Sequence, residues 1–392
     1  MEACFRSPRY AILISIFWHM DFSLKNMLGS FGKSSQSVVG IDIGSSSIKV
    51  VQLKKKGGRA ILETYGELAL GPYSGLEVGR ATNLPGNKIG EALNDLLREA
   101  NVTTKLGGMA IPIASSMVSL IEMPSLDQKL LAQMIPIEAR KYIPVPISEV
   151  ALDWWIIPQD KSKSSYIGGD NKQLEQGRMI DVLLVVILNE ALHKYQEIVK
   201  MASLDMSFFE IEIFSTMRAV LDQDIQPVMI FDMGAASTKL YITERGIIRA
   251  SHTINRGSQD ITLAISHALT IPVADAERMK RDVGLTGVAE SKNMSIVAET
   301  ILQYTFSEAN RVLLNFEKKY NKNVSKVVLT GGGVTLKGFY DVAKNSFQTE
   351  IFLGNPFAKV ETPAFLEEIL KQAGPEFAVA VGVALRRLQE FS

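Results

Sequence analysis

Residues 38–53 read VVGIDIGSSSIKVVQL, and residues 228–243 read VMIFDMGAASTKLYIT. In both stretches an apolar run ends at an aspartate, turns through a glycine and small residues, and leaves as a second run that carries a lysine. Each stretch is therefore predicted to be a β-hairpin with an acid at the end of its first strand. Because the pattern occurs twice, we expect two similar half-domains. The residues in register are Asp42 with Asp232, Gly44 with Gly234, Ser47 with Ser237 and Lys49 with Lys239.

Such a hairpin has the properties of a phosphate-binding loop. Glycine and small residues let backbone N–H groups approach phosphate oxygens, which a bulky side chain would prevent. Lys49 can add a positive charge to the phosphates. Asp42 and Asp232, facing each other across a cleft, would hold a hydrated Mg²⁺, which takes few carboxylates and many waters. One D-x-G hairpin alone is more often an ordinary β-turn, so the prediction depends on the doubled copy.

Composition limits the class of protein. The 392 residues suffice for two or more domains, and 42 basic residues balance 42 acidic ones, so nothing points to bulk nucleic-acid binding. The single cysteine, Cys4, excludes an intramolecular disulfide framework or a CxxC metal site. The four histidines are far apart in the sequence and are not expected to bind metal. A reducing, cytoplasmic compartment is therefore expected.

Residues 1–37 need a separate interpretation. The apolar stretch 11–18, AILISIFW, is much shorter than the roughly 20 residues of a membrane-spanning helix, and no small-residue cleavage site follows it. One hypothesis is that translation starts at Met20 or Met27, so that the earlier residues are not part of the working protein. The alternative is a disordered tail.

Hydrophobic periodicity and turn residues predict the remaining elements. Pro136 lies within a predicted helix over 125–142, where a kink or a split is expected. The charged, Ser- and Gly-rich stretch 160–178 is predicted to be an exposed loop. The predicted last helix, 375–388, is called the closing helix, and it carries an Ala/Gly face that would permit close helix packing where two halves meet. The predicted strands are 60–68, 108–113, 117–123, 151–157, 180–188, 246–252 and 326–330, and the other predicted helices are 87–100, 190–202, 212–221, 257–269, 274–281, 295–320, one from 337, and 375–388.

The two hairpins, together with a strand that runs into the glycine triplet 331–333, resemble the actin-like ATPases over residues 38–387. The resemblance implies a duplicated, ribonuclease H-like α/β fold with a nucleotide cleft between two half-domains. The expected division is 38–118 and 181–225 with the closing helix 375–390 for the first half, 119–180 for an inserted subdomain like that of FtsA, 226–272 and 325–374 for the second half, and 273–324 for its helical subdomain.

Within that superfamily the chain resembles the PilM family of type IV pilus assembly proteins. The most specific string is IEARKYIPVPISEVALDWWII at 137–157. Further matches are ADAERMKR at 274–281, LTGGGVTLKGF at 329–339, GNPF at 354–357 and EFAVAVGVALR at 376–386.

The resemblance implies a site for ATP and Mg. Glu277 and Lys280 would reach the ribose or the base, although charges on a helix face usually contact water. Lys239 is the weaker of the two lysine candidates and is expected to be exposed, because its loop carries alanines where the first loop carries serines. The first phosphate loop would comprise Asp42, Gly44, Ser45, Ser46, Ser47 and Lys49, the second Asp232, Gly234, Ala235, Ala236 and Ser237, and the adenosine turn Gly332 and Gly333.

The resemblance also implies the function. PilM-like proteins bind ATP but act chiefly as a cytoplasmic scaffold at the inner-membrane face. There they dock the N-terminal peptide of the membrane protein PilN and so link PilO and the pilus motor and platform proteins. The expected groove is lined by Tyr142, Pro144 and Trp154, a surface that would receive an extended peptide. At most weak ATPase activity is expected, no catalytic residue is predicted, and a homo-oligomer is possible.

Two alternatives stay open. A small-molecule kinase on the same fold would need a carboxylate poised against a substrate hydroxyl, and the phosphate loops show no surplus acid. A filament-forming division protein of the FtsA type would end in a membrane-targeting amphipathic helix, and none follows the closing helix at 375–388.

Overall fold

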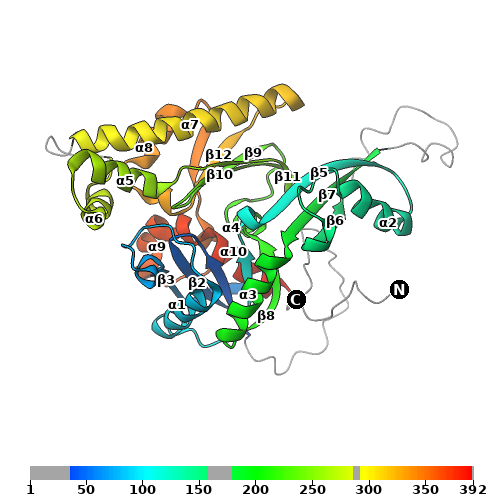
Figure 1. Ribbon diagram of the computed structural model, residues 1–392, viewed down its shortest axis with the longest axis horizontal. Helices are drawn as coiled ribbons and strands as arrows, with labels where there is room; N and C mark the ends of the chain where they lie inside the picture. Colours follow the sequence, from blue (N-terminus) through cyan, green and yellow to red (C-terminus); the bar gives the residue numbers. More distant parts are fainter. Residues whose placement is uncertain (1–35, 158–178, 286–291, 391–392) are drawn as a thin grey trace.

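The computed structural model describes residues 36–157, 179–285 and 292–390 of the chain. The proposed starts at Met20 and Met27 and the loop expected over 160–178 lie outside the described residues. Two five-stranded sheets and one three-stranded sheet, with helices packed on them, make up the described part (Figure 1).

The two large sheets have the same topology. In each, three consecutive strands form an antiparallel meander, and two further strands add in parallel beside the first strand of the meander. This common order confirms the prediction of two similar half-domains. The first sheet has the order β3-β2-β1-β4-β8, with β1 Ser37–Ile43, β2 Ser47–Lys56, β3 Arg59–Ala69, β4 Leu106–Ile111 and β8 Asp205–Ile211. The second has the order β11-β10-β9-β12-β13, with β9 Val228–Met233, β10 Thr238–Glu244, β11 Ile247–Ile254, β12 Lys326–Thr330 and β13 Glu350–Leu353.

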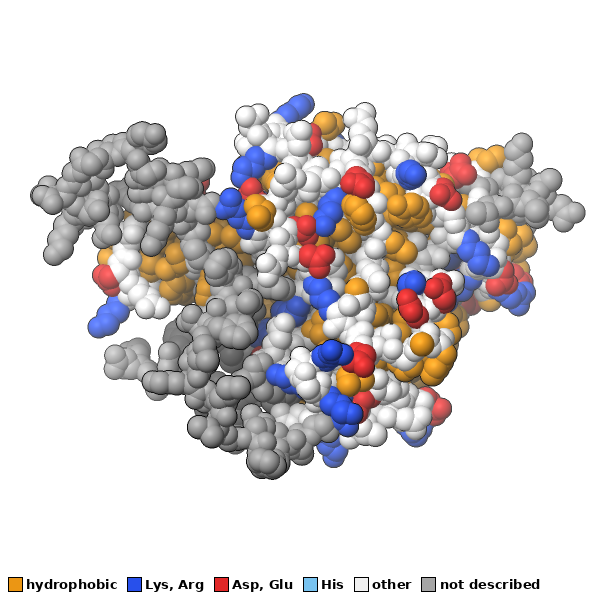
Figure 2. Space-filling view, turned by 180° about the vertical axis from the view of Figure 1, so that it is seen from behind, with side chains coloured by type: hydrophobic (Ala, Val, Ile, Leu, Met, Phe, Trp, Pro, Cys, Tyr) orange, Lys and Arg blue, Asp and Glu red, His pale blue; other side chains and the backbone are white. Residues whose placement is uncertain are grey.

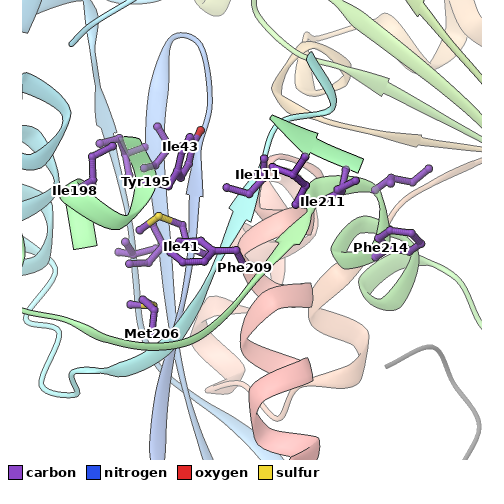
Figure 3. Close-up of a cluster of buried hydrophobic side chains, with 14 of the residues drawn as sticks. Ile41, Ile43, Ile111, Tyr195, Ile198, Met206, Phe209, Ile211 and Phe214 are labelled. Atoms are coloured by element: carbon purple, nitrogen blue, oxygen red, sulfur yellow. The ribbon is translucent and has the colours of Figure 1, made fainter. Parts of the chain in front are cut away.

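Each large sheet is covered by helices that bury an apolar face. In the first half, α1 (Gly86–Glu99) and α3 (Asn189–Met201) pack on the sheet, and side chains from β1, α3 and β8 meet in one core (Figure 3). In the second half, α7 (Lys292–Tyr320) crosses the sheet beside α5 (Ser258–Leu269) and α8 (Phe339–Ser346), and α6 (Val273–Val283) packs on α5 (Figure 1). The centre of that core is an aromatic cluster of Phe231, Phe306, Phe339 and Phe347.

The third sheet, of order β5-β7-β6, extends away from the first half (Figure 1). It consists of β5 Ser116–Pro124, β6 Val150–Ile156 and β7 Met179–Leu188 and therefore spans residues 116–188, a wider range than the 119–180 expected for the insert. One face of β7 packs against α2 (Gln128–Ala139) and the other against the core of the first half. Burial on both faces explains why β7 is apolar at nearly every position.

Helix α2 runs through Pro136 without a break, so the expected split is absent. The helix begins at Asp127, whose carboxylate accepts hydrogen bonds from the N–H groups of Lys129 and Leu130. It buries Leu131, Ile135 and Ala139 against the small sheet. Packing of this face maintains the helix although proline removes one backbone hydrogen bond.

Two helices connect the halves, α4 (Glu212–Val220) and α10 (Ala378–Gln389), and they lie side by side at the centre of the molecule (Figure 1). The predicted small-residue face of α10 does allow close packing, because a Cβ on Gly382 would lie 1.9 Å from the carbonyl oxygen of Ser215. Buried Arg218 and Arg386 from the two helices both bond the carboxylate of Glu210 on β8.

Strands β8 and β13 and the short helix α9 (Glu367–Ala373) were not predicted from the sequence. On the face shown in Figure 2, acidic and basic side chains are interspersed, in agreement with the balanced charge of the chain. Within the described residues, no helix combines the length and the apolar character that crossing a membrane requires.

Candidate functional site

The two predicted hairpins face one cavity of about 330 Å³ between the half-domains. The glycine turn after β12 and helix α6 also line it, together with residues from β3, α4, α5 and the start of α10. The structure therefore brings every residue predicted for the nucleotide site into a single cavity. These residues are Asp42, Gly44, Ser45, Ser46, Ser47, Lys49, Asp232, Gly234, Ala235, Ala236, Ser237, Glu277, Lys280, Gly332 and Gly333.

The hairpins have matching backbone geometry. The N–H of Gly44 donates to the carbonyl of Ser47 over 2.9 Å, and the N–H of Gly234 donates to that of Ser237 over the same 2.9 Å. In both, the aspartate lies directly opposite the lysine in the antiparallel ladder. The duplicated sequence pattern thus folds into two equivalent turns that open toward the same space.

The aspartates carry raised pKa values. Burial raises the pKa of Asp42 to about 7, although the ammonium of Lys49 opposes the shift. Burial also raises the pKa of Asp232, opposed by Lys239. The carboxylate of Glu212 adds to both shifts by like-charge repulsion. These three acids make this end of the cavity a place where a cation would be favourable.

Lys239 is not exposed, so that expectation is wrong. Its ammonium lies 2.7 Å from the Glu212 carboxylate at the start of α4, and 18% of the side chain is exposed. Burial works to lower the pKa of Lys239, but Glu212 and Asp232 outweigh it and raise the value above its ordinary range. Glu212 also accepts the N–H of Ile113 over 2.8 Å. The ion pair joins the second hairpin to the helix that connects the halves.

Lys49 has a different partner. Its ammonium pairs with Glu67 on β3 at 3.0 Å and donates to the hydroxyl of Ser47 at 2.8 Å. Burial works to lower the pKa of Lys49, but Glu67 and then Glu376 raise it above its ordinary value. Lys49 therefore stays charged beside the first hairpin.

Glu277 and Lys280 do not form a solvated helix face, because both are buried. The Lys280 ammonium contacts the Glu277 carboxylate at 2.7 Å, and the hydroxyl of Thr262 bridges them. Arg281 donates to the other oxygen of Glu277 over 2.7 Å. Burial works against ionisation of Glu277, but Lys280 lowers its pKa below the ordinary value. The pair therefore forms an ordered wall of the cavity.

Residues 79–81 of the first half reach the second half at the edge of the cavity. Gly79 has a φ of +87°, which favours glycine, and a Cβ there would lie 2.5 Å from the carboxylate carbon of Glu277. The N–H of Ala81 donates to the side chain of Gln259 on α5 over 3.0 Å. This hydrogen bond is a link between the halves in addition to the connecting helices.

The sequence reasoning missed four charged residues of the cavity: Glu67, Glu212, Arg281 and Glu376. Burial, and then repulsion from Glu67, raises the pKa of Glu376 to about 7. Glu67 could have been found from strand register, because it lies opposite Lys49 in the β2–β3 ladder. Glu376 lies just before α10 and Glu212 at the start of α4, so an acid at the entry to each connecting helix was the other available signal.

The residues predicted for the partner groove lie on the inserted part. Tyr142 is 44% exposed and Pro144 is exposed, whereas Trp154 is partly buried against the core under α2. The neighbouring Trp155 points to the other face of β6 and is 41% exposed. The three residues therefore divide between the surface and the small core, and their assignment to a groove stays a proposal.

Comparison with known proteins assigns the family. The family model described as "Type IV pilus assembly protein PilM" matches residues 40–388. Among solved structures, the one titled "PilM-PilN type IV pilus biogenesis complex" is similar with a TM-score of 0.74 and 23% identity, over 90% of this chain and 98% of that one. This likeness confirms the actin-like α/β fold expected from the sequence.

More distant relatives are cell division proteins FtsA. The protein of Neisseria meningitidis serogroup B is 24% identical over 335 residues, which cover 76% of this chain and 80% of the relative. The protein of Bacillus subtilis is 22% identical over 58% of this chain, and the match spans only 57% of that relative. The family match covers more of this chain than either FtsA match does. The chain belongs to the family of the type IV pilus assembly protein PilM.

Proposed function

We propose that this protein is an ATP-binding scaffold of type IV pilus assembly that docks the N-terminal peptide of PilN beside its inserted sheet. The observation that carries the nucleotide part is the convergence of two equivalent hairpins and a glycine turn on one cavity. Two turns with small residues allow backbone N–H groups to approach a phosphate chain from both halves. The glycine turn would lie against the adenosine.

The residues present also fit a magnesium ion. In the described part of the chain, no group of three or more His, Cys, Asp or Glu side chains is arranged to hold a metal by itself. Mg²⁺ bound with a nucleotide needs only one or two carboxylates, with water and phosphate oxygens as the remaining ligands. Asp42 and Asp232 would hold it, and it would neutralise phosphate charge. Their pKa values are raised because burial disfavours the charged carboxylates, and a bound cation would favour the charged form.

Asp42 and Asp232 provide the test of the nucleotide site. Replacing either by alanine should weaken Mg-ATP binding while the fold persists, as measured by calorimetry and circular dichroism. Exposed Asp205 on β8 offers the control, and its alanine variant should bind as the wild type does. Unchanged affinity in both site variants would count against this cavity.

The peptide-binding part of the proposal rests on the family and on the inserted sheet. The similar solved structure is of a complex that contains PilN. Here Tyr142 and Pro144 are exposed next to α2, and Trp155 presents an exposed ring on edge strand β6. Exposed aromatic and proline side chains around an ordered sheet suit an extended peptide. Binding to PilN would hold the protein at the inner-membrane face and link it indirectly to PilO and the pilus motor and platform proteins.

The docking experiment is a titration with a labelled peptide from the N-terminus of the organism's own PilN, with and without Mg-ATP. Saturable binding that Tyr142→Ala weakens would support the proposal. An affinity that depends on nucleotide would show that the cleft and the groove are coupled. Tyr340→Ala, at a side chain 40% exposed in the second half, is the matched control. Absence of peptide binding in both states would contradict the docking role.

An FtsA-like filament protein is the second candidate, supported by the FtsA relatives. Sedimentation with ATP would detect such filaments, and the same runs would report whether the protein forms a smaller homo-oligomer. A small-molecule kinase has less support, because Glu212 at the phosphate end already pairs with Lys239 and with the N–H of Ile113. Phosphorylation of a sugar by the purified protein would support the kinase alternative.

A further inference from the structure

Residues 70–82, named here the bridging loop, begin and end on the first hairpin. The loop follows β3 and ends shortly before α1. The N–H of Leu70 donates to the carbonyl of Ser46 over 2.8 Å, and the N–H of Thr82 donates to that of Ser45 over 2.8 Å. The hydroxyl of Thr82 also donates to the carbonyl of Ser45, over 3.2 Å. Both ends of the bridging loop are therefore fixed on neighbouring residues of one phosphate turn.

The bridging loop has an ordered interior. The hydroxyl of Tyr73 donates to the carboxylate of Asp95 on α1 over 2.6 Å. The N–H of Leu76 donates to the carbonyl of Gly71 over 2.9 Å. A Cβ on Gly71 would lie 2.1 Å from the carbonyl oxygen of Glu77, so the loop closes tightly on itself. These contacts hold the middle of the loop in a defined position relative to the first hairpin.

The middle of the bridging loop, residues 79–81, contacts two helices of the second half. Gly79 packs on the carboxylate of Glu277 on α6. The N–H of Ala81 donates to the side-chain oxygen Oε1 of Gln259 on α5 over 3.0 Å. The loop thus carries a hydrogen-bonded connection from the first hairpin to the start of α5.

The start of α5 is in turn fixed on the second hairpin. The N–H of Gln259 donates to the carbonyl of Ala235 over 3.0 Å. The N–H of Ser258 donates to the carbonyl of Gly234 over 2.9 Å. Gln259 therefore accepts a hydrogen bond from the bridging loop with its side chain and donates one to the second hairpin with its backbone. The whole connection consists, in order, of Ser45, Thr82, Ala81, Gln259 and Ala235.

A ligand that contacts both hairpins depends on the distance between them. The triphosphate of the proposed nucleotide is such a ligand, and it binds most tightly when the N–H groups of both turns are already in place. Gln259 is not among the described residues that line the cavity, so it would act through the hairpins and not by touching the ligand. We propose that Gln259 is a positioning residue that holds the two hairpins at the separation that ATP requires, an inference that rests on the proposed nucleotide site.

The test removes the acceptor oxygen of Gln259 and then restores it. Calorimetric titrations with Mg-ATP would compare the wild type, Gln259→Met and Gln259→Glu. The methionine side chain has a similar length but cannot accept the N–H of Ala81, so ATP affinity should fall about fivefold, within the net value of one hydrogen bond. The glutamate side chain keeps an acceptor at the same length, so this variant should lose less affinity than the methionine variant.

Hydrogen exchange separates positioning from a general loss of structure. In ligand-free Gln259→Met, exchange followed by mass spectrometry should become faster in residues 79–82 and at the start of α5, and should stay unchanged in the strands of the second sheet. Exposed Gln303 on α7 provides the matched control Gln303→Met, which should bind ATP as the wild type does.

The outcomes distinguish this inference from the nucleotide site on which it rests. Unchanged ATP affinity in Gln259→Met, an equal loss in Gln259→Glu, or faster exchange throughout the second sheet would overturn the role of Gln259 while the nucleotide site stands. Failure of the wild type to bind Mg-ATP would overturn the nucleotide site itself, and the inference with it.

Discussion

The two hairpins have the same backbone and different electrostatic surroundings. Both close with an N–H to carbonyl bond of 2.9 Å, and both place an aspartate opposite a lysine. Lys49 pairs with Glu67 of its own half, whereas Lys239 pairs with Glu212 at the start of the helix that joins the halves. The two turns thus have the same backbone geometry, while their lysines have partners in different parts of the molecule.

The difference has a physical consequence. Glu67 is 33% exposed, so water shares in solvating its pair with Lys49. Glu212 is 8% exposed, and its pair with Lys239 also anchors the start of α4. A buried pair is costly to break, because the remaining charge has no solvent to replace its partner. The Lys49 pair is therefore the less costly of the two to break, although the Lys49 side chain is 11% exposed and that of Lys239 is 18% exposed. The Lys239 pair connects the second hairpin to α4.

The largest expected effect is on stability. Lys239→Ala should lower the free energy of unfolding by about 3 kcal/mol, because it leaves Glu212 buried and unpaired. Lys49→Ala should cost only about 1 kcal/mol, because water can reach Glu67. Urea denaturation at pH 7 measures both values.

The control for both variants is Lys371→Ala, on an exposed helix pair with Glu367 and Glu368, which should cause no measurable change. Equal losses for Lys49→Ala and Lys239→Ala would show that the two pairs are equivalent and would remove the contrast between the halves.

A pH dependence should follow from Asp42. Its folded pKa of about 7 lies above its unfolded value of 3.8, so the folded state binds more protons between these values. Stability must then fall as pH rises through this window, by up to about 1.4 kcal/mol per pH unit for one proton, and level off above it. Asp42→Asn removes the group, so its unfolding free energy should fall less between pH 5 and 7. An identical slope in wild type and variant would contradict the raised pKa of Asp42.

The repeated motifs allowed the halves, the hairpins and the glycine turn to be predicted, because these features depend on local patterns such as D-x-G and an apolar run into Gly331-Gly332-Gly333. Strand β8 was missed because its sequence, DMSFFEI, lacks a turn signal that would separate it from helix α4. Strand β13 has only four residues and pairs solely with β12 at the sheet edge. Such short edge strands leave little pattern in a sequence.

The missed site residues have a different cause. Glu212 and Glu376 are ordinary acids in the sequence, and their position in the cavity depends on how α4 and α10 pack between the halves. The burial of Glu277 also follows from tertiary structure, since Gly79 of the other half packs directly on its carboxylate. The pattern of residues along one helix cannot show that a residue of the other half-domain buries one of its side chains.

A smaller effect tests whether the hairpin backbones are equivalent. A Cβ on Gly44 would lie 3.1 Å from the Ser47 carbonyl oxygen, and one on Gly234 would lie 3.2 Å from that of Ser237. Gly44→Ala and Gly234→Ala should therefore change stability equally, within about 0.5 kcal/mol. Each variant should also lower the affinity for ATP about tenfold, because the added methyl group displaces one phosphate contact. A large difference between the variants, measured by calorimetry, would mean that only one turn contacts the phosphates.

The smallest effect concerns the loop side chains, in which the hairpins differ most plainly. Ser45 and Ser46 offer hydroxyls to the cavity where Ala235 and Ala236 offer none. Removing both hydroxyls should lower ATP affinity about fivefold, within the usual net value of a hydrogen bond. Introducing hydroxyls into the second hairpin with Ala235→Ser and Ala236→Ser should change ATP affinity less than about twofold. Backbone N–H groups would already contact the phosphates there, and Lys239 is paired with Glu212. Equal and opposite changes in the two double variants would show that the hairpins are interchangeable, and that the contrast between their lysines does not extend to the ligand.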